Sequence, residues 1–103
     1  MPVRASLSAE ISRALGRPFR AEAVREAGGG CSHRALVLEG GGERWFAKLN
    51  APGALPVFEA EADGLAALAS CRAFRVPRPL CCALLDGQAC LVMEWLDLQP
   101  LAA

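Results

Sequence analysis

The sequence lacks several features that would place it in a particular functional class. Its 103 residues carry 11 basic and 11 acidic side chains, so it has no basic excess of the kind that nucleic-acid and membrane surfaces need. No apolar run approaches the ~18–20 residues that span a bilayer, and residues 1–6 lack the apolar core of a signal peptide. We therefore expect a cytoplasmic protein that contacts neither nucleic acid nor membrane.

Metal-binding and disulfide patterns are also missing. Histidine occurs only once, as His33, and the five cysteines include no C-x-x-C pair. We therefore expect neither a zinc site nor a disulfide framework. Cys81, Cys82 and Cys90 lie in apolar segments and are predicted to be small core residues.

What the sequence does contain is enough apolar material for one core. Hydrophobic residues make up 53% of the chain and its mean hydropathy is +0.27, which predicts one domain or a piece of one. Apolar spacing predicts helices over 6–15 and 56–70, and strands over 19–27, 33–38, 45–50, 80–85 and 88–93. The expected fold class is α+β, a five-stranded antiparallel sheet with one main covering helix and a short N-terminal helix.

Two charged residues occupy positions where the pattern predicts apolar ones. Lys48 lies in the middle of the β-prone segment 45–50, where alternation places it on the same face as Phe46. Glu61 falls inside the apolar stripe of the helix over 56–70, formed by Phe58, Ala62, Leu65, Leu68 and Ala69. Each would be costly to bury alone, and the cost falls if the two side chains meet. In protein kinases a Lys–Glu pair of this kind positions an ammonium against nucleotide phosphates. The alternative is an edge lysine whose stem reaches water.

A glycine run precedes Lys48 by eighteen residues. The spacing Gly28-x-Gly30-x-x-His33-x-Ala35 follows the kinase loop G-x-G-x-x-G-x-V, with departures at its last two positions. Glycines let backbone N–H groups approach phosphates closely, so this loop is a candidate phosphate cover. Three glycines between strands are also typical of an ordinary turn.

The segment after the last strand completes the kinase-like arrangement. Kinases connect to their second lobe through such a segment, where the Glu94 carbonyl and the Leu96 N–H could pair with an adenine edge. Met93 would flank the adenine. Without the other motifs, an ordinary last strand with a tail explains this segment equally well.

Taken in order, these segments resemble the fructosamine kinase (ketosamine-3-kinase) family, within the wider aminoglycoside phosphotransferase-like and protein-kinase-like group. The matching stretches are Gly29-Gly30-Cys31-Ser32-His33-Arg34-Ala35, Trp45-Phe46-Ala47-Lys48-Leu49-Asn50, Phe58-Glu59-Ala60-Glu61-Ala62-Asp63-Gly64-Leu65, Val76-Pro77-Arg78-Pro79-Leu80 and Val92-Met93-Glu94-Trp95-Leu96. The resemblance implies ATP-dependent phosphorylation of the sugar of ketosamines, which leads to protein deglycation.

The same resemblance implies roles for individual residues. Lys48 would bind phosphate and Glu61 would be its helix partner. The other nucleotide-binding candidates lie in the glycine run and in the last segment: Gly28, Gly29, Gly30, Cys31, Ser32, Ala35, Met93, Glu94, Trp95 and Leu96. Ser32 departs from the family, in which an apolar residue is common at this position.

The resemblance also implies a part of the family's fold that these residues do not supply. Members continue into a helical lobe with an H-G-D-x-x-x-x-N catalytic loop and a metal-binding aspartate, and neither occurs in this sequence. We therefore expect residues 1–103 to form a nucleotide-binding lobe, with no catalytic residue and no Mg²⁺ ligand. The expected ligands of the intact enzyme are ATP, Mg²⁺ and a ketosamine small molecule or glycated protein.

Other functions remain open at this point. The chain could be a non-catalytic nucleotide-binding module, a self-associating fragment, or a lobe of another small-molecule kinase. An exposed apolar face around Ala35, Phe46, Met93 and Trp95 predicts a homo-oligomer. Cys31 is a redox candidate, because glycine-loop amides and Arg34 favour its thiolate and two loops could form a Cys31–Cys31 disulfide.

Overall fold

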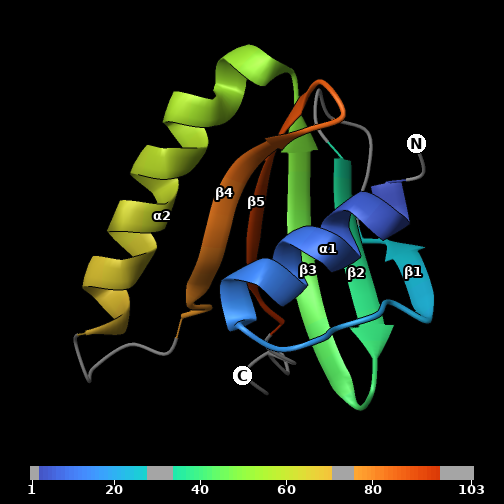
Figure 1. The fold of residues 1–103 in the computed structure, drawn as a ribbon. Helices are drawn as coiled ribbons and strands as arrows, with labels where there is room; N and C mark the ends of the chain where they lie inside the picture. The colour runs from blue at the N-terminus through green and yellow to red at the C-terminus, as the bar shows by residue number, and fades with distance from the viewer. Residues whose placement is uncertain (1–2, 28–33, 71–75, 96–103) are drawn as a thin grey trace.

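The computed structural model describes residues 3–27, 34–70 and 76–95 and contains the predicted α+β fold (Figure 1). Five antiparallel strands form one sheet in the order β1-β2-β3-β5-β4, so β3 is the central strand. No helix in these ranges is both long and apolar enough to cross a membrane. In chain order the elements are α1 (Val3–Leu15), β1 (Ala23–Glu26), β2 (Arg34–Gly40), β3 (Glu43–Asn50), a 3₁₀ turn (Pro52–Ala54), α2 (Leu55–Ala69), β4 (Pro79–Leu85) and β5 (Gln88–Glu94).

Two turn sequences predict hairpins, the glycine-rich stretch 39–43 and Asp86-Gly87, and both hairpins are present. Gly41 and Gly42 join β2 to β3 with φ angles of 57° and 82°, and Asp86 and Gly87 join β4 to β5 with φ angles of 51° and 76°. Positive φ at both central residues is the two-residue turn whose twist matches that of the flanking strands. These turns fix the registers of β2 against β3 and of β4 against β5.

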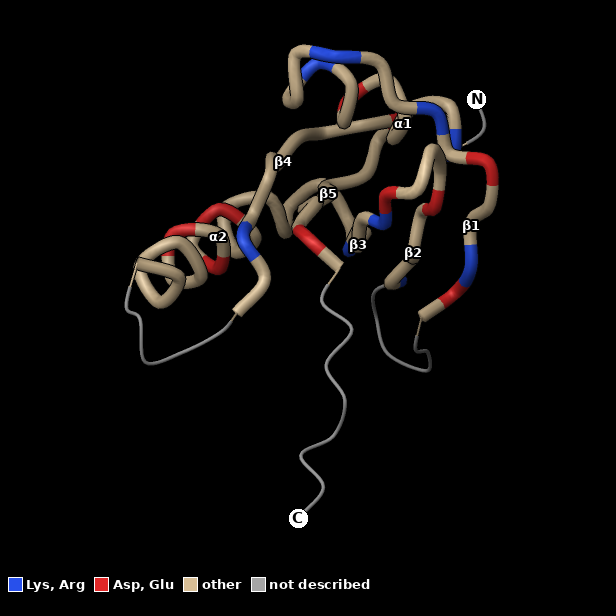
Figure 2. Tube along the Cα trace, turned by 90° about the horizontal axis from the view of Figure 1, so that it is seen from below, with Lys and Arg blue, Asp and Glu red and all other residues tan. Residues whose placement is uncertain are grey.

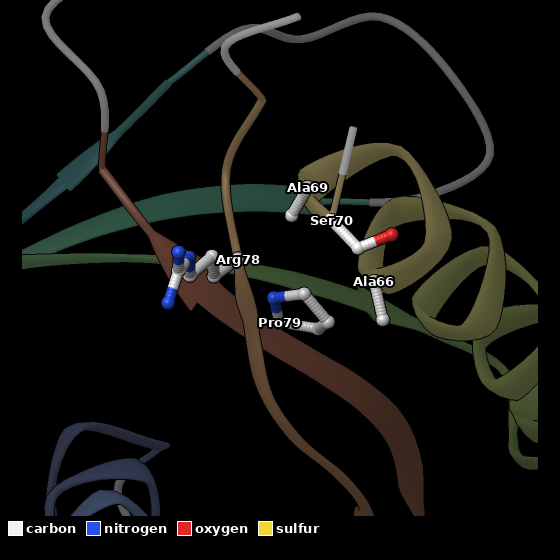
Figure 3. Close-up of a pocket in the computed structure, with 5 residues that line it drawn as sticks. All are labelled: Ala66, Ala69, Ser70, Arg78 and Pro79. Carbon is white, nitrogen blue, oxygen red and sulfur yellow. The ribbon is translucent and has the colours of Figure 1, made fainter. Parts of the chain in front are cut away.

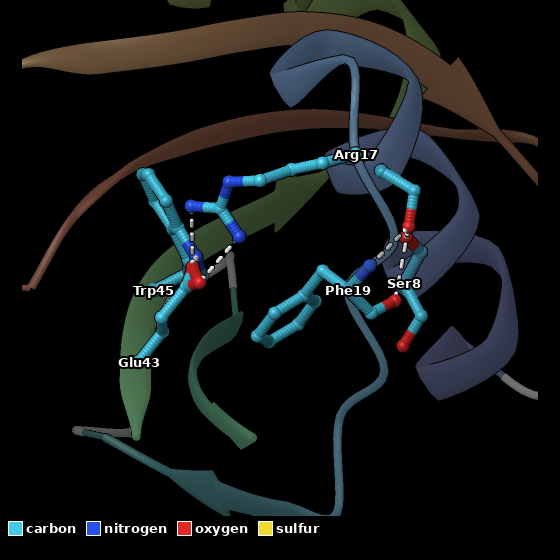
Figure 4. Close-up of polar contacts among 6 residues, drawn as sticks. Ser8, Arg17, Phe19, Glu43 and Trp45 are labelled. Carbon is cyan, nitrogen blue, oxygen red and sulfur yellow. Dashed lines mark hydrogen bonds and ion pairs between the residues drawn. The ribbon is translucent and has the colours of Figure 1, made fainter. Parts of the chain in front are cut away.

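The first strand is shorter than predicted, because α1 captures the backbone before it. The Phe19 N–H donates to Ser12 Oγ at 2.8 Å, and the Ala21 N–H donates to Ser8 Oγ at 3.0 Å. Figure 4 shows the Phe19 contact. The N–H groups of Phe19 and Ala21 are therefore bonded to helix α1 and not to a neighbouring strand. The register of β1 against β2 begins at Ala23.

Arg17 also anchors the chain between α1 and β1, through an ion pair with Glu43. Its guanidinium bonds both carboxylate oxygens of Glu43, which also accepts the Trp45 indole N–H at 3.2 Å (Figure 4). The Arg17 hydrogen bond lowers the pKa of Glu43. The chain also passes so close to Gly40 that an added Cβ would lie 2.0 Å from the Arg20 carbonyl oxygen. Any larger residue at position 40 would therefore clash with the backbone of Arg20.

The two helices pack on opposite faces of the sheet, and the N-terminal helix is the more deeply buried of the two. Leu7 and Ile11 of α1 are 1% and 0% exposed and pack on a core formed by Leu36, Leu38, Ala47, Leu49, Cys90 and Val92. The expected main helix, α2, buries only Phe58 fully, and Leu68 of its predicted stripe is 45% exposed. The reason is position, since α2 packs over β4 and β5 at one side of the sheet (Figure 1).

Candidate functional site

Lys48 lies on the central strand β3, on the face that α2 covers in part. Its cross-strand neighbours are Ala35 on β2 and Leu91 on β5. Phe46 shares this face and packs with the α2 cluster, whereas Ala47 and Leu49 point into the α1 core. The alternation predicted from the sequence is therefore confirmed.

The structure brings Lys48 and Glu61 together. Lys48 Nζ lies 2.6 Å from Glu61 Oε2, a short charge-assisted contact between β3 and α2. The expectation that both groups are buried is wrong: their side chains are 27% and 33% exposed. Because α2 sits at the side of the sheet, it covers Lys48 only in part, and one side of the ion pair faces solvent.

This geometry suits an ammonium that must also meet an external anion. An ammonium has three N–H donors, and Glu61 Oε2 accepts one of them. The ion pair fixes the direction of the lysine stem, and its partial exposure gives a ligand access. The arrangement can therefore hold a phosphate oxygen without moving the side chain.

The end of β5 differs from the prediction in one respect. Met93 is only 4% exposed and packs with Phe58 and Leu91, while Ala35, Phe46 and Trp95 are half-buried. The predicted apolar face is therefore only partly exposed among the described residues, because Met93 is covered and the other three side chains are half-buried. Oligomerisation remains a prediction, which the exposure of this face does not support.

Phe46 was not predicted as part of the candidate site, although it lies beside Lys48 on the same face. Its ring centroid lies 5.8 Å from that of Trp95, with 31° between the ring planes, a favourable aromatic separation. Its position two residues before Lys48 could have indicated this, because residues two apart on a strand point to the same face of the sheet.

Several predicted site residues lie outside the described residues: Gly28, Gly29, Gly30, Cys31, Ser32 and Leu96. Ala35 is described, and it lies directly across from Lys48. The described part of the chain holds no cluster of three His, Cys, Asp or Glu residues that could bind a metal. Acidic side chains gather on α2, at Glu59, Glu61 and Asp63 (Figure 2).

The described cysteines are predicted to be poor nucleophiles. Burial raises the pKa of Cys81 to about 12 and that of Cys90 to about 11, and it also raises the pKa of Cys82. Thiolates, not thiols, react with alkylating reagents. Limiting iodoacetamide at pH 7.5 should therefore modify Cys31 before these three, as peptide mapping by mass spectrometry would show. Modification of Cys90 ahead of Cys31 would contradict the predicted reactivity of Cys31.

Comparisons with known proteins agree on one family. The sequence profile of the family described as fructosamine kinase matches residues 3–103. A probable ketoamine kinase of Synechocystis is 39% identical over 92 residues, which cover 89% of this chain and 31% of that protein. A probable ketoamine kinase of Klebsiella aerogenes is 38% identical over 82 residues, covering 80% of this chain and 29% of that protein.

A solved structure shares the fold. A crystal structure from Haemophilus somnus, of a protein provisionally named fructosamine-3-kinase, matches 93% of this chain with a TM-score of 0.83 at 23% identity. The match covers 32% of that chain. This chain thus spans about a third of the length of the relatives that it matches.

Proposed function

Since the chain belongs to the fructosamine kinase family, we propose that it is the nucleotide-binding lobe of a kinase that phosphorylates the sugar of ketosamines. The observation that carries the proposal is the 2.6 Å contact between Lys48 and Glu61, on the face of the sheet that α2 covers only in part. In this role Lys48 contacts the phosphates of ATP and Glu61 orients the lysine. Ketosamine small molecules or glycated proteins are the proposed substrates, and deglycation is the proposed outcome.

The residues present fit a nucleotide in two respects. A fixed, solvent-accessible ammonium suits phosphate oxygens, and the half-buried Phe46 and Trp95 on the same face suit a flat base. Bound Mg-ATP would supply the phosphoryl group, and this chain's own residues would hold and orient it. We propose that the catalytic loop and the Mg²⁺ ligands lie in the remaining two thirds of the family's length.

This division of labour predicts binding without turnover. The chain as given should bind Mg-ATP in a calorimetric titration, yet form no phosphorylated product with fructoselysine above the no-protein control. Positioning phosphates without a base or metal ligands supplies only part of the transition-state stabilisation. Product formation that disappears in Lys48→Met would show that the 103 residues are catalytically sufficient, and would overturn the proposed division.

A further inference from the structure

The sheet has one long edge on which no further strand lies. Strand β4 is the last in the order β1-β2-β3-β5-β4 and pairs only with β5. The two-residue turn after β4 makes Leu85 and Gln88 a hydrogen-bonded pair, and such pairs alternate along the ladder. The backbone groups of Cys82 and Leu84 therefore point away from β5. In the part of the chain that the structure describes, these N–H and C=O groups have no hydrogen-bond partner.

This edge lacks the features that keep most edge strands unpaired. Natural edge strands are often short, or carry charges and prolines that block a further strand. The opposite edge strand, β1, has four residues and includes Arg25 and Glu26. In β4, residues 80–85 are all apolar or cysteine, and Pro79 stands at the first position only. Leu84 is 54% exposed. The backbone and side chains of β4 therefore suit pairing with an added strand.

Each helix leaves a hollow beside this strand. A hollow of about 330 Å³ separates the start of β4 from the last turn of α2, and its lining consists of Ala66, Ala69, Ser70, Arg78 and Pro79 (Figure 3). A second hollow of about 370 Å³ lies where α1 passes the end of β4, lined by Ala5, Ser6, Ala9, Glu10, Arg13 and Leu85. Glu10 and Arg13 form an ion pair with each other, so the second hollow suits an apolar side chain.

The α2 side of the edge carries negative charge. Cys82 packs with the α2 cluster, where its thiol donates to the Phe58 carbonyl at 3.7 Å, and alternation places Leu84 on the same face. Burial, together with the charges of Glu59 and Asp63, raises the pKa of Cys82. These two carboxylates are exposed, and α2 contains no lysine or arginine (Figure 2). No ion pair within the described ranges involves either of them.

This charge decides which kind of strand fits the edge. In an antiparallel β4–β4 pair the two-fold axis stands perpendicular to the sheet, so a second copy would place its own α2 carboxylates on the same face. Like charges at short range disfavour that arrangement. A partner strand with basic side chains on this face would instead complement Glu59 and Asp63. Arg78 lies four residues before Cys82, about 13 Å along the strand, which exceeds the screening length of about 10 Å.

We propose that the β4 edge binds an extended segment of a partner protein, in which basic and apolar residues alternate, as an added antiparallel strand. The backbone of the segment bonds Cys82 and Leu84, the mode of recognition called β-augmentation. Residues directly opposite these two lie on the same face, so the basic side chains lie beside Glu59 and Asp63. The alternate residues lie on the α1 face, where apolar side chains fill the second hollow. This edge is separate from Lys48, and the inference does not rest on nucleotide binding.

The test uses the full chain and a fluorescein-labelled octapeptide of alternating lysine and valine. Fluorescence anisotropy should show saturable binding, and the matching glutamate–valine peptide should bind at least about tenfold more weakly. Glu59→Gln combined with Asp63→Asn should weaken binding of the lysine peptide about fivefold, as expected for two exposed ion pairs. Glu22→Gln combined with Glu26→Gln removes two exposed carboxylates near the opposite edge and should change that affinity by less than about twofold.

Backbone methylation of the peptide tests strand pairing without changing the protein. In the proposed register the lysine N–H groups face β4 and the valine N–H groups face away. N-methylation of every lysine should abolish binding, whereas N-methylation of every valine should leave the affinity within about threefold. Leu84→Pro makes the matching change on the protein, because it removes an outward N–H and leaves the ladder with β5 intact. This variant should bind the lysine peptide at least about fivefold more weakly.

Three results would overturn the proposal. Equal affinities for the lysine and glutamate peptides would exclude a basic partner, and equal effects of the two N-methylations would exclude strand pairing. Dimerisation of the chain in sedimentation velocity that Leu84→Pro abolishes would assign the edge to a second copy. Should Leu84→Pro not fold by circular dichroism, the methylated peptides still decide the question on the unchanged chain.

Discussion

Lys48→Met should lower the affinity of the chain for Mg-ATP by at least about tenfold, because it removes a charge-assisted contact to phosphate. The free energy of unfolding should change by less than about 1 kcal/mol, since an ion pair with partly exposed side chains contributes little to stability. Isothermal titration calorimetry and urea denaturation measure the two quantities separately. A large loss of affinity with little loss of stability would identify Lys48 as a ligand contact.

Arg44→Met is the matched control for this substitution. Arg44 lies four residues before Lys48 on β3, so both side chains start from the same face of the strand, and Arg44 pairs with Glu39 at 2.7 Å. Removing this cation should leave Mg-ATP affinity within about twofold of the unchanged chain, because Arg44 is outside the proposed site. If both variants lose affinity equally, general electrostatic attraction explains binding and Lys48 has no special role.

Leu7→Ala is expected to have the largest effect on stability. Leu7 is 1% exposed in the core between α1 and the sheet, so truncation leaves a cavity in a well-packed region. Such substitutions cost about 2–5 kcal/mol, a large share of the roughly 5–15 kcal/mol that stabilises a typical domain. The measurement is the midpoint of urea unfolding followed by far-ultraviolet circular dichroism.

Leu68→Ala makes the same chemical change on the other helix. Leu68 is 45% exposed on α2, so its truncation should cost no more than about 0.5 kcal/mol. The pair therefore tests the unequal burial of the two helices, with residue type and secondary structure held constant. A larger loss in Leu68→Ala than in Leu7→Ala would show that α2 carries the core in solution.

Local sequence signals predicted most of the fold. Strand alternation placed Lys48 and Phe46 on one face, and the Gly41-Gly42 and Asp86-Gly87 turns predicted both hairpins, because these signals depend on neighbouring residues alone. The start of β1 could not be predicted this way. It depends on Ser8 and Ser12 taking backbone N–H groups of residues 19–21, a contact between segments that only the packed fold brings together.

The site shows the same limit. The helical pattern placed Glu61 on the inner face of α2, and the contact with Lys48 followed from the cost of burying either charge alone. The degree of burial did not follow, because periodicity gives the direction in which a residue points and not how far a helix overlaps the sheet. The contact of Phe46 with Trp95 was also missed, since it joins two segments distant in sequence.

The unequal packing of the two helices predicts two cooperative units within the domain. Helix α1 shares a continuous core with β2, β3 and β5, so its opening requires the global free energy of unfolding. Helix α2 fully buries only Phe58 and can open at a lower free energy while the sheet stays folded. Its opening separates Glu61 from Lys48, and a nucleotide that binds only the paired form would stabilise α2 through linkage. Under the proposed function, occupancy of the site and closure of α2 would be coupled equilibria, even though the nucleotide need not touch most of the helix.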